Sequence, residues 1–110
     1  MRIQYAGRSL LLTGDIEGRG LAQLLTSPAE HVDVLQSPHH GANAANPPDL
    51  ARWSTPTVAL ISTGNRDRAA ALTPVYGPDG RVLSTANGGA LRVHIAPNGD
   101  LTSQAFLDAR

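Results

Sequence analysis

The chain has 110 residues, with nine arginines as its only basic side chains besides four histidines, nine acidic residues and no cysteine. This length suits one small domain. The lack of cysteine excludes disulfides and thiolate metal sites, so any metal ligands must be histidines and carboxylates. A formal net charge of zero argues against a strongly nucleic-acid-binding surface. The apolar runs are far shorter than the roughly 20 residues of a membrane-spanning helix.

The first part of the chain predicts strands alternating with a helix. Residues 2–5 alternate weakly and indicate a short strand, and the continuous apolar run at 9–13 indicates a buried one. Leucines at helical spacing predict a helix over about residues 18–26. A second buried strand begins at residues 32–35 and is stopped by Pro38.

The middle of the chain contains a helix start and a third buried strand. At residues 46–49, the order Asn-Pro-Pro-Asp predicts a helix with Asn46 as the N-cap and proline at the first helical position. Leu50 and Trp53 are expected to pin this short helix to the body of the protein. Residues 57–62 are rich in Val, Leu and Ile and predict a strand, whereas residues 64–80 favour no single element.

The last third of the chain predicts three strands and two turns. Strands at 81–85 and 90–95 flank an Asn-Gly-Gly hairpin signal at 87–89, and a Pro-Asn-Gly-Asp turn at 97–100 leads into a strand at about 101–106. The element order indicates an α/β fold: a mixed sheet with short helices, extended or flanked by a C-terminal β-meander.

Unusual residues follow two of the buried strands. Asp15, with Glu17 close behind, follows the first, and His39 and His40 open a polar loop, residues 39–46, after the second. If these strands are neighbours, the three side chains project into one crevice, where they could bind zinc, manganese or iron. Alternatively, Asp15 caps a helix or shapes a turn, the histidines are a solvated pair, and Glu17 is a solvated residue of the first helical turn.

Other polar residues have plainer interpretations. His31 lies at a helix–strand junction and is expected at the surface, and His94 is out of phase with its apolar neighbours and should face away from the core. Asn65, Arg66 and the two residues after them follow the third buried strand. They either line the same crevice, where Asn65 and Arg66 would bind substrate, or form an ion-paired exposed turn.

The residues that carry these candidates resemble the metallo-β-lactamase superfamily. The run LLTGDIE at 11–17, the run VDVLQSPHHG at 32–41, and residues 57–66 occur in the same order and at similar spacing there. The closest branch is the C-terminal hydrolase domain of ComEC-like competence DNA-uptake proteins. The similarity covers about residues 2–68, and the C-terminal hairpin region resembles the end of that domain more weakly.

The resemblance implies a metallo-β-lactamase (αββα-type) fold and a binuclear metal hydrolase. Asp15 would bridge two divalent ions, zinc or manganese, and His39 or His40 would supply another ligand or a phosphate-binding donor. Metal-bound hydroxide would attack a phosphodiester, with DNA as the implied substrate. A ComEC-like parent protein would be attached to the membrane, with this segment in the aqueous phase.

The chain departs from the family pattern in three places. No H-x-H-x-D-H motif precedes Asp15, alanines stand at 69–71 where the family has Gly-His-Pro, and Ala42 replaces a serine. We therefore expect residues 1–110 to be the C-terminal half of such a domain, and most of the metal ligands to be outside this chain. The alternative is a metal-free, non-catalytic remnant that serves as an accessory or protein-interaction domain. Half of a two-sheet fold would expose an apolar sheet face, which predicts aggregation or homo-oligomers.

Overall fold

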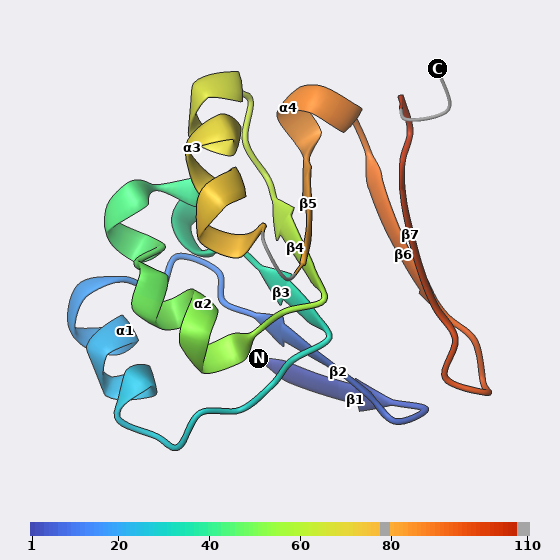
Figure 1. Cartoon of the computed structure of the whole chain (residues 1–110), viewed down its shortest axis with the longest axis horizontal. Coiled ribbons are helices and arrows are strands. Elements are labelled where there is room, and N and C mark those ends of the chain that lie inside the picture. The colour runs from blue at the N-terminus through green and yellow to red at the C-terminus, as the bar shows by residue number, and fades with distance from the viewer. Residues whose placement is uncertain (78–79, 108–110) are drawn as a thin grey trace.

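A computed structural model describes residues 1–77 and 80–107 (Figure 1). A five-stranded sheet has the strand order β1-β2-β3-β4-β5, in which β1 and β2 are antiparallel and every later pair is parallel. Three helices cover one face of this sheet, and a separate two-stranded hairpin, β6-β7, lies on the other side (Figure 1). The predicted α/β class, a mixed sheet with short helices, is confirmed.

The observed elements are short. The strands are β1 (Arg2–Tyr5), β2 (Arg8–Leu12), β3 (Val34–Gln36), β4 (Val58–Ile61), β5 (Arg81–Ser84), β6 (Leu91–Ile95) and β7 (Leu101–Ala105). The helices are α1 (Gly18–Leu25), α2 (Pro48–Ser54), α3 (Arg66–Tyr76) and α4 (Thr85–Gly88), with 3-10 turns at Pro38–Gly41 and Asn43–Ala45. None of the described helices is long and apolar enough to cross a lipid bilayer.

The main core lies between the sheet and helices α1 to α3. Strand register aligns Leu11, Leu35, Ala59 and Val82 across four strands, so these side chains share one face of the sheet. The buried side chains that pack with this row are Leu21, Leu50, Trp53, Ile61, Leu72 and Tyr76. Leu50 and Trp53 do pin α2 as expected, and the Trp53 indole N–H also donates to the Ser27 carbonyl at 3.0 Å.

The opposite face of the sheet is apolar as well, and the hairpin lies against it. Val34 and Val58 on this face are buried, whereas Leu10, Leu12, Leu60 and Leu83 are half-buried. In β6 and β7 the half-buried residues alternate with exposed ones, and His94 is among the exposed, as its phase predicted. Ile3 and Tyr5 on the edge strand β1 remain exposed, and the expected self-association stays a prediction.

The predicted hairpin at 87–89 is wrong. β5 pairs in parallel with β4, and residues 85–88 form the helical turn α4, after which the chain leaves the sheet to form β6. The Ser84 hydroxyl accepts from the Asn87 amide and caps this turn. A Cβ atom on Gly88 would lie 2.5 Å from the Ala105 Cβ, so glycine here permits the hairpin to pack against α4. The turn at 97–100 is confirmed, because β6 and β7 pair on either side of it.

Two further expectations about helices need correction. The N-cap of α2 is Pro47, and the Asn46 side chain is buried and bonded elsewhere. The unassigned segment 64–80 contains α3, which Asn65 caps by accepting from the Asp67 and Arg68 amides. Residues 78 and 79 of the segment 64–80 lie outside those that the structure describes. Pro74 inside α3 and the weak amphipathic pattern concealed this helix in the sequence.

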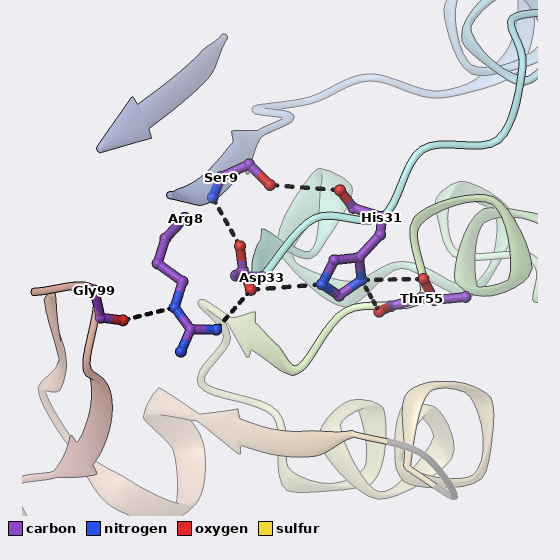
Figure 2. Close-up of polar contacts among 6 residues, drawn as sticks. All are labelled: Arg8, Ser9, His31, Asp33, Thr55 and Gly99. Carbon is purple, nitrogen blue, oxygen red and sulfur yellow. Dashed lines mark hydrogen bonds and ion pairs between the residues drawn. The ribbon is translucent and has the colours of Figure 1, made fainter. Parts of the chain in front are cut away.

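A polar network fixes the edge of the sheet at which β2, β3 and β4 begin (Figure 2). The Asp33 carboxylate accepts from the Ser9 amide at 2.8 Å and pairs with the Arg8 guanidinium at 3.0 Å. His31 donates from Nδ1 to the Thr55 carbonyl, which can only accept, and presents Nε2 to Asp33 at 3.4 Å. Arg8 also donates from Nε to the carbonyl of Gly99 in the hairpin turn at 2.7 Å.

The electrostatics of this network lower the pKa of Asp33. Burial alone would raise it, but the hydrogen bond from the Ser9 amide and the charge and hydrogen bond of Arg8 hold the pKa below the usual 3.8. A carboxyl group with a lowered pKa stabilises the fold above the pKa of the unfolded chain. That stability is lost as pH falls through the lower, folded-state pKa.

Asp33→Asn should lower the free energy of unfolding at neutral pH by about 2 kcal/mol, the scale of hydrogen bonds to a charged group. Urea denaturation followed by circular dichroism measures it. As pH falls below 3.8, the difference between wild type and variant should shrink, because only wild type loses the Asp33 contribution. Asp67→Asn, at an exposed position of α3, is the matched control. An equal loss in both variants would contradict the prediction.

Candidate functional site

The carboxyl ends of β2, β3 and β4 meet at one edge of the sheet because these strands are parallel and adjacent. The loops that follow the first two are bonded to each other. The Thr13 hydroxyl donates to the Gln36 carbonyl at 2.6 Å, and the His39 amide donates to the Gly14 carbonyl at 2.9 Å. The two strands are therefore neighbours, which is the condition for Asp15 and the histidines to share a crevice. The loop that carries Asp15 lies against the turn Pro38–Gly41, here called the histidine turn.

Asp15 is exposed at this edge, and its carboxylate has no hydrogen bond or ion pair with any residue the structure describes. The carboxylate that reaches the histidines is instead Glu17, whose Oε2 lies 2.8 Å from His39 Nδ1. Glu17 stands at the N-cap position of α1 without capping it through its side chain. Glu17 is solvated, as the sequence indicated, and its contact with His39 is the feature that the sequence did not reveal.

His40 is oriented by a different partner. Its Nδ1 lies 2.9 Å from the Ser62 carbonyl, which can only accept, so Nδ1 carries the proton. The neutral ring then has an unprotonated Nε2. His39 is held by Glu17 in the same way, through Nδ1. Within the described chain, Nε2 of neither ring has a hydrogen-bond partner, so both are open to a ligand.

The histidine turn has a strained backbone. His39 has φ 49° and ψ 50°, His40 has φ 53° and ψ 33°, and Gly41 follows with φ 80°. Left-handed conformation costs a non-glycine residue about 1 kcal/mol or more, and such strain clusters at functional sites. Gly41 tolerates this conformation, and a Cβ atom there would lie only 2.8 Å from Ile61 Cγ2.

The buried side chain of Asn46 holds the two ends of the strained turn together, and we call this arrangement the Asn46 clamp. Its Nδ2 donates to the Pro38 carbonyl at 3.0 Å and to the Ala42 carbonyl at 2.7 Å, at the two ends of the turn. Its Oδ1 accepts from the Ser37 hydroxyl and the Tyr76 hydroxyl, both at 2.6 Å. Burial raises the pKa of Tyr76 well above its usual range, so this hydroxyl stays protonated and remains a donor even at alkaline pH. The clamp is a function of Asn46 that its place before two prolines concealed.

Of the two candidate substrate-binding residues after β4, one stabilises a helix and the other is exposed to solvent. Asn65 uses its side-chain oxygen to cap α3, and Arg66 is exposed in the first turn of that helix. Of the alternative interpretation, an ion-paired exposed turn, the exposure is confirmed, but no described residue forms an ion pair with this segment. Arg68, two residues further along the helix, is the residue that reaches the histidine turn. Its Nη1 lies 3.4 Å from the His40 carbonyl.

The fit of this edge to a metal ion is partial. Histidines that bind metals through Nε2 are commonly held in this way, with Nδ1 donating to a carboxylate or to a backbone carbonyl. The number of ligands is insufficient, because among the described residues no group of three or more His, Asp or Glu side chains is placed to hold an ion. The described chain therefore offers oriented imidazoles and a free Asp15, but not a complete metal centre.

The other histidines do not belong to this edge. Both nitrogens of His31 face acceptors in the Asp33 network, at the opposite edge of the sheet (Figure 2). His94 lies on the outer face of β6, beside Arg92, Thr102 and Gln104. The network at the amino edge serves to hold strands together, since its charged groups are already bonded to one another.

His39→Gly should be more stable than His39→Ala by about 1 kcal/mol, because only glycine adopts a left-handed backbone without a steric penalty. Both variants lack the imidazole, so the difference isolates the backbone strain. Thermal or urea unfolding of the two proteins measures it. The same pair of substitutions at His94, which lies in an extended strand, should give the opposite order. Equal stability of the two His39 variants would contradict the strained conformation.

Comparison of the chain with protein families, with curated proteins and with solved structures finds no match. The functional assignment therefore depends on the geometry of the carboxyl edge and on the sequence motifs that form it.

Proposed function

We propose that the chain is the C-terminal half of a metallo-β-lactamase-like hydrolase domain, similar to that of ComEC-like DNA-uptake proteins. Its role is to contribute Asp15, His39 and His40 to a metal site whose other ligands belong to a segment outside this sequence. The observation that carries this proposal is the anchoring of both imidazoles through Nδ1 at one strained turn. Such anchoring leaves each Nε2 available, as a metal ligand requires.

The layered arrangement supports the same proposal. A helix-covered sheet with a second, smaller β layer on its other face is compatible with half of an αββα fold (Figure 1). The half-buried leucines of that second face and the exposed Ile3 and Tyr5 leave apolar surface for further strands.

The chemistry implied is phosphodiester hydrolysis, with DNA as substrate. Two divalent ions, zinc or manganese, would supply the activation of water and the stabilisation of charge in such a reaction. The residues of this chain would orient two imidazoles and provide one carboxylate. Because the described ligand set is incomplete, we assign no catalytic step to the chain alone.

The alternative, a metal-free accessory domain, has an observation in its favour. Among the described residues, no group of three potential ligands is placed to hold an ion. The two proposals differ in whether the histidine turn binds an ion, and the following measurement separates them.

The 110-residue chain should bind zinc or manganese through the histidine turn, as measured by isothermal titration calorimetry. His39→Ala, His40→Ala and Asp15→Asn should each weaken binding by more than about tenfold. Glu17→Gln should weaken it by about tenfold, because it removes the anchor of His39 but no proposed ligand.

His94→Ala is the control, because it removes an exposed histidine from a different layer of the fold. If binding is absent, or is the same in wild type and all the variants at the carboxyl edge, the accessory-domain alternative replaces the enzyme proposal.

The coding sequence upstream of Met1, read in frame, should encode an H-x-H-x-D-H motif, because the proposed site needs further histidines. A chain extended to include it should cleave single-stranded DNA in the presence of zinc or manganese, and the 110-residue chain should not. A nuclease assay on both proteins measures this. Absence of the motif, or metal-dependent cleavage by the short chain, would show the half-site proposal to be wrong.

A further inference from the structure

A pocket of about 410 Å³ adjoins the histidine turn on the side of α3. It is lined by His40, Ser62, Thr63, Gly64, Arg68 and Thr85. The walls thus come from four segments: the turn after β3, the β4–α3 connection, the first turn of α3 and the start of α4. Among the described residues, no Asp or Glu lines it.

The pocket contains more free donors than acceptors. The Ser62 hydroxyl and the Gly64 amide have no hydrogen-bond partner in the described chain, and the Thr63 hydroxyl accepts from the Asn65 amide, which leaves its proton free. Two of its backbone acceptors are engaged, because the Ser62 carbonyl accepts from His40 and the Thr63 carbonyl accepts from Thr85, whereas His40 Nε2 remains open. Free N–H and O–H groups around an opening are the arrangement that binds anions.

Arg68 supplies a positive charge that no described carboxylate neutralises. Its position is defined by packing and by a hydrogen bond. A Cβ atom on Gly41 would lie 3.8 Å from Arg68 Cδ, so the aliphatic stem lies close over the glycine of the strained turn. Nη1 points to the His40 carbonyl at 3.4 Å, which leaves the other guanidinium N–H groups available.

We propose that this pocket is an anion site for a phosphate group, with Arg68 as its principal binding residue and the Ser62 and Thr63 hydroxyls as additional donors. A guanidinium matches the oxygens of a phosphate group with two parallel hydrogen bonds, and hydroxyl donors complete the contacts. The identification of the anion as the phosphate of an ester substrate rests on the proposed function. That the pocket binds an anion is argued from its own donors and does not depend on that function. In this proposal Arg68 takes the substrate-binding role that one interpretation of the sequence gave to Asn65 and Arg66.

The test measures binding of inorganic phosphate to the 110-residue chain in EDTA, by NMR titration of backbone amides at constant ionic strength. Wild type should show saturable shifts at Ser62, Thr63 and Gly64. Arg68→Met should weaken binding by about tenfold or more, Arg68→Lys by less, and Ser62→Ala by a few-fold, in keeping with the loss of a charged or a neutral donor.

Arg19→Met is the matched control, since it removes the same charge from an exposed position on α1. Arg66→Met tests the neighbouring arginine outside the pocket. If Arg68→Met weakens binding no more than these two variants, or if phosphate shifts no pocket amide, the proposal is overturned. Thymidine monophosphate and a thymidylyl dinucleotide, titrated in the same way, distinguish a monoester from a diester.

EDTA separates this result from the metal proposal. Phosphate binding in EDTA together with absent zinc binding would uphold the anion pocket and remove the metal site. Zinc binding without phosphate binding would uphold the metal site and remove the anion pocket.

Discussion

The carboxylate of Asp33 is the constraint on which the arrangement of this protein depends. Asp33 immediately precedes β3, and its carboxylate bonds to the first residues of β2, to His31, and through Arg8 to the hairpin turn. Because parallel strands run from this edge in a common register, fixing their starts also fixes where they end. The loops that carry Asp15 and His39 are therefore placed by bonds at the opposite edge of the sheet. A charge buried at one edge thus determines the geometry of the other.

The elements that could be predicted are those whose signal is local. Continuous apolar runs identified β2, β3 and β4, since strands buried on both faces need apolar residues throughout. α3 and α4 were missed because tertiary contacts decide them. Pro74 argues against a helix by itself, but Ala69, Leu72 and Tyr76 at helical spacing bury one face and outweigh it. At residues 87–89 the hairpin signal was outweighed by the close approach of Gly88 to Ala105, 17 residues later.

The candidate site was predictable in its residue types but not in its contacts. Asp15, His39 and His40 follow buried strands, and that position is visible in the sequence. The pairing of Glu17 with His39 spans 22 residues and needs a left-handed His39, which no local pattern indicates. Arg68 was overlooked in favour of Arg66 because only the helical conformation of this segment shows which arginine faces the turn. The residues that position the site are therefore harder to predict than those that would act in it.

The two edges of the sheet divide stability and function between them. At the amino edge, the charged groups of Arg8 and Asp33 bond to each other and to backbone groups. At the carboxyl edge, imidazole nitrogens, hydroxyls and a guanidinium face solvent beside a strained turn. Such a turn persists only where its surroundings determine it, as they do here through the Asn46 clamp and the packing of Gly41. Free donors placed by a rigid support need little reorganisation to bind a ligand. The carboxyl edge is thus the part of the described chain where strain and unused bonding capacity coincide, and it is there that a binding function belongs.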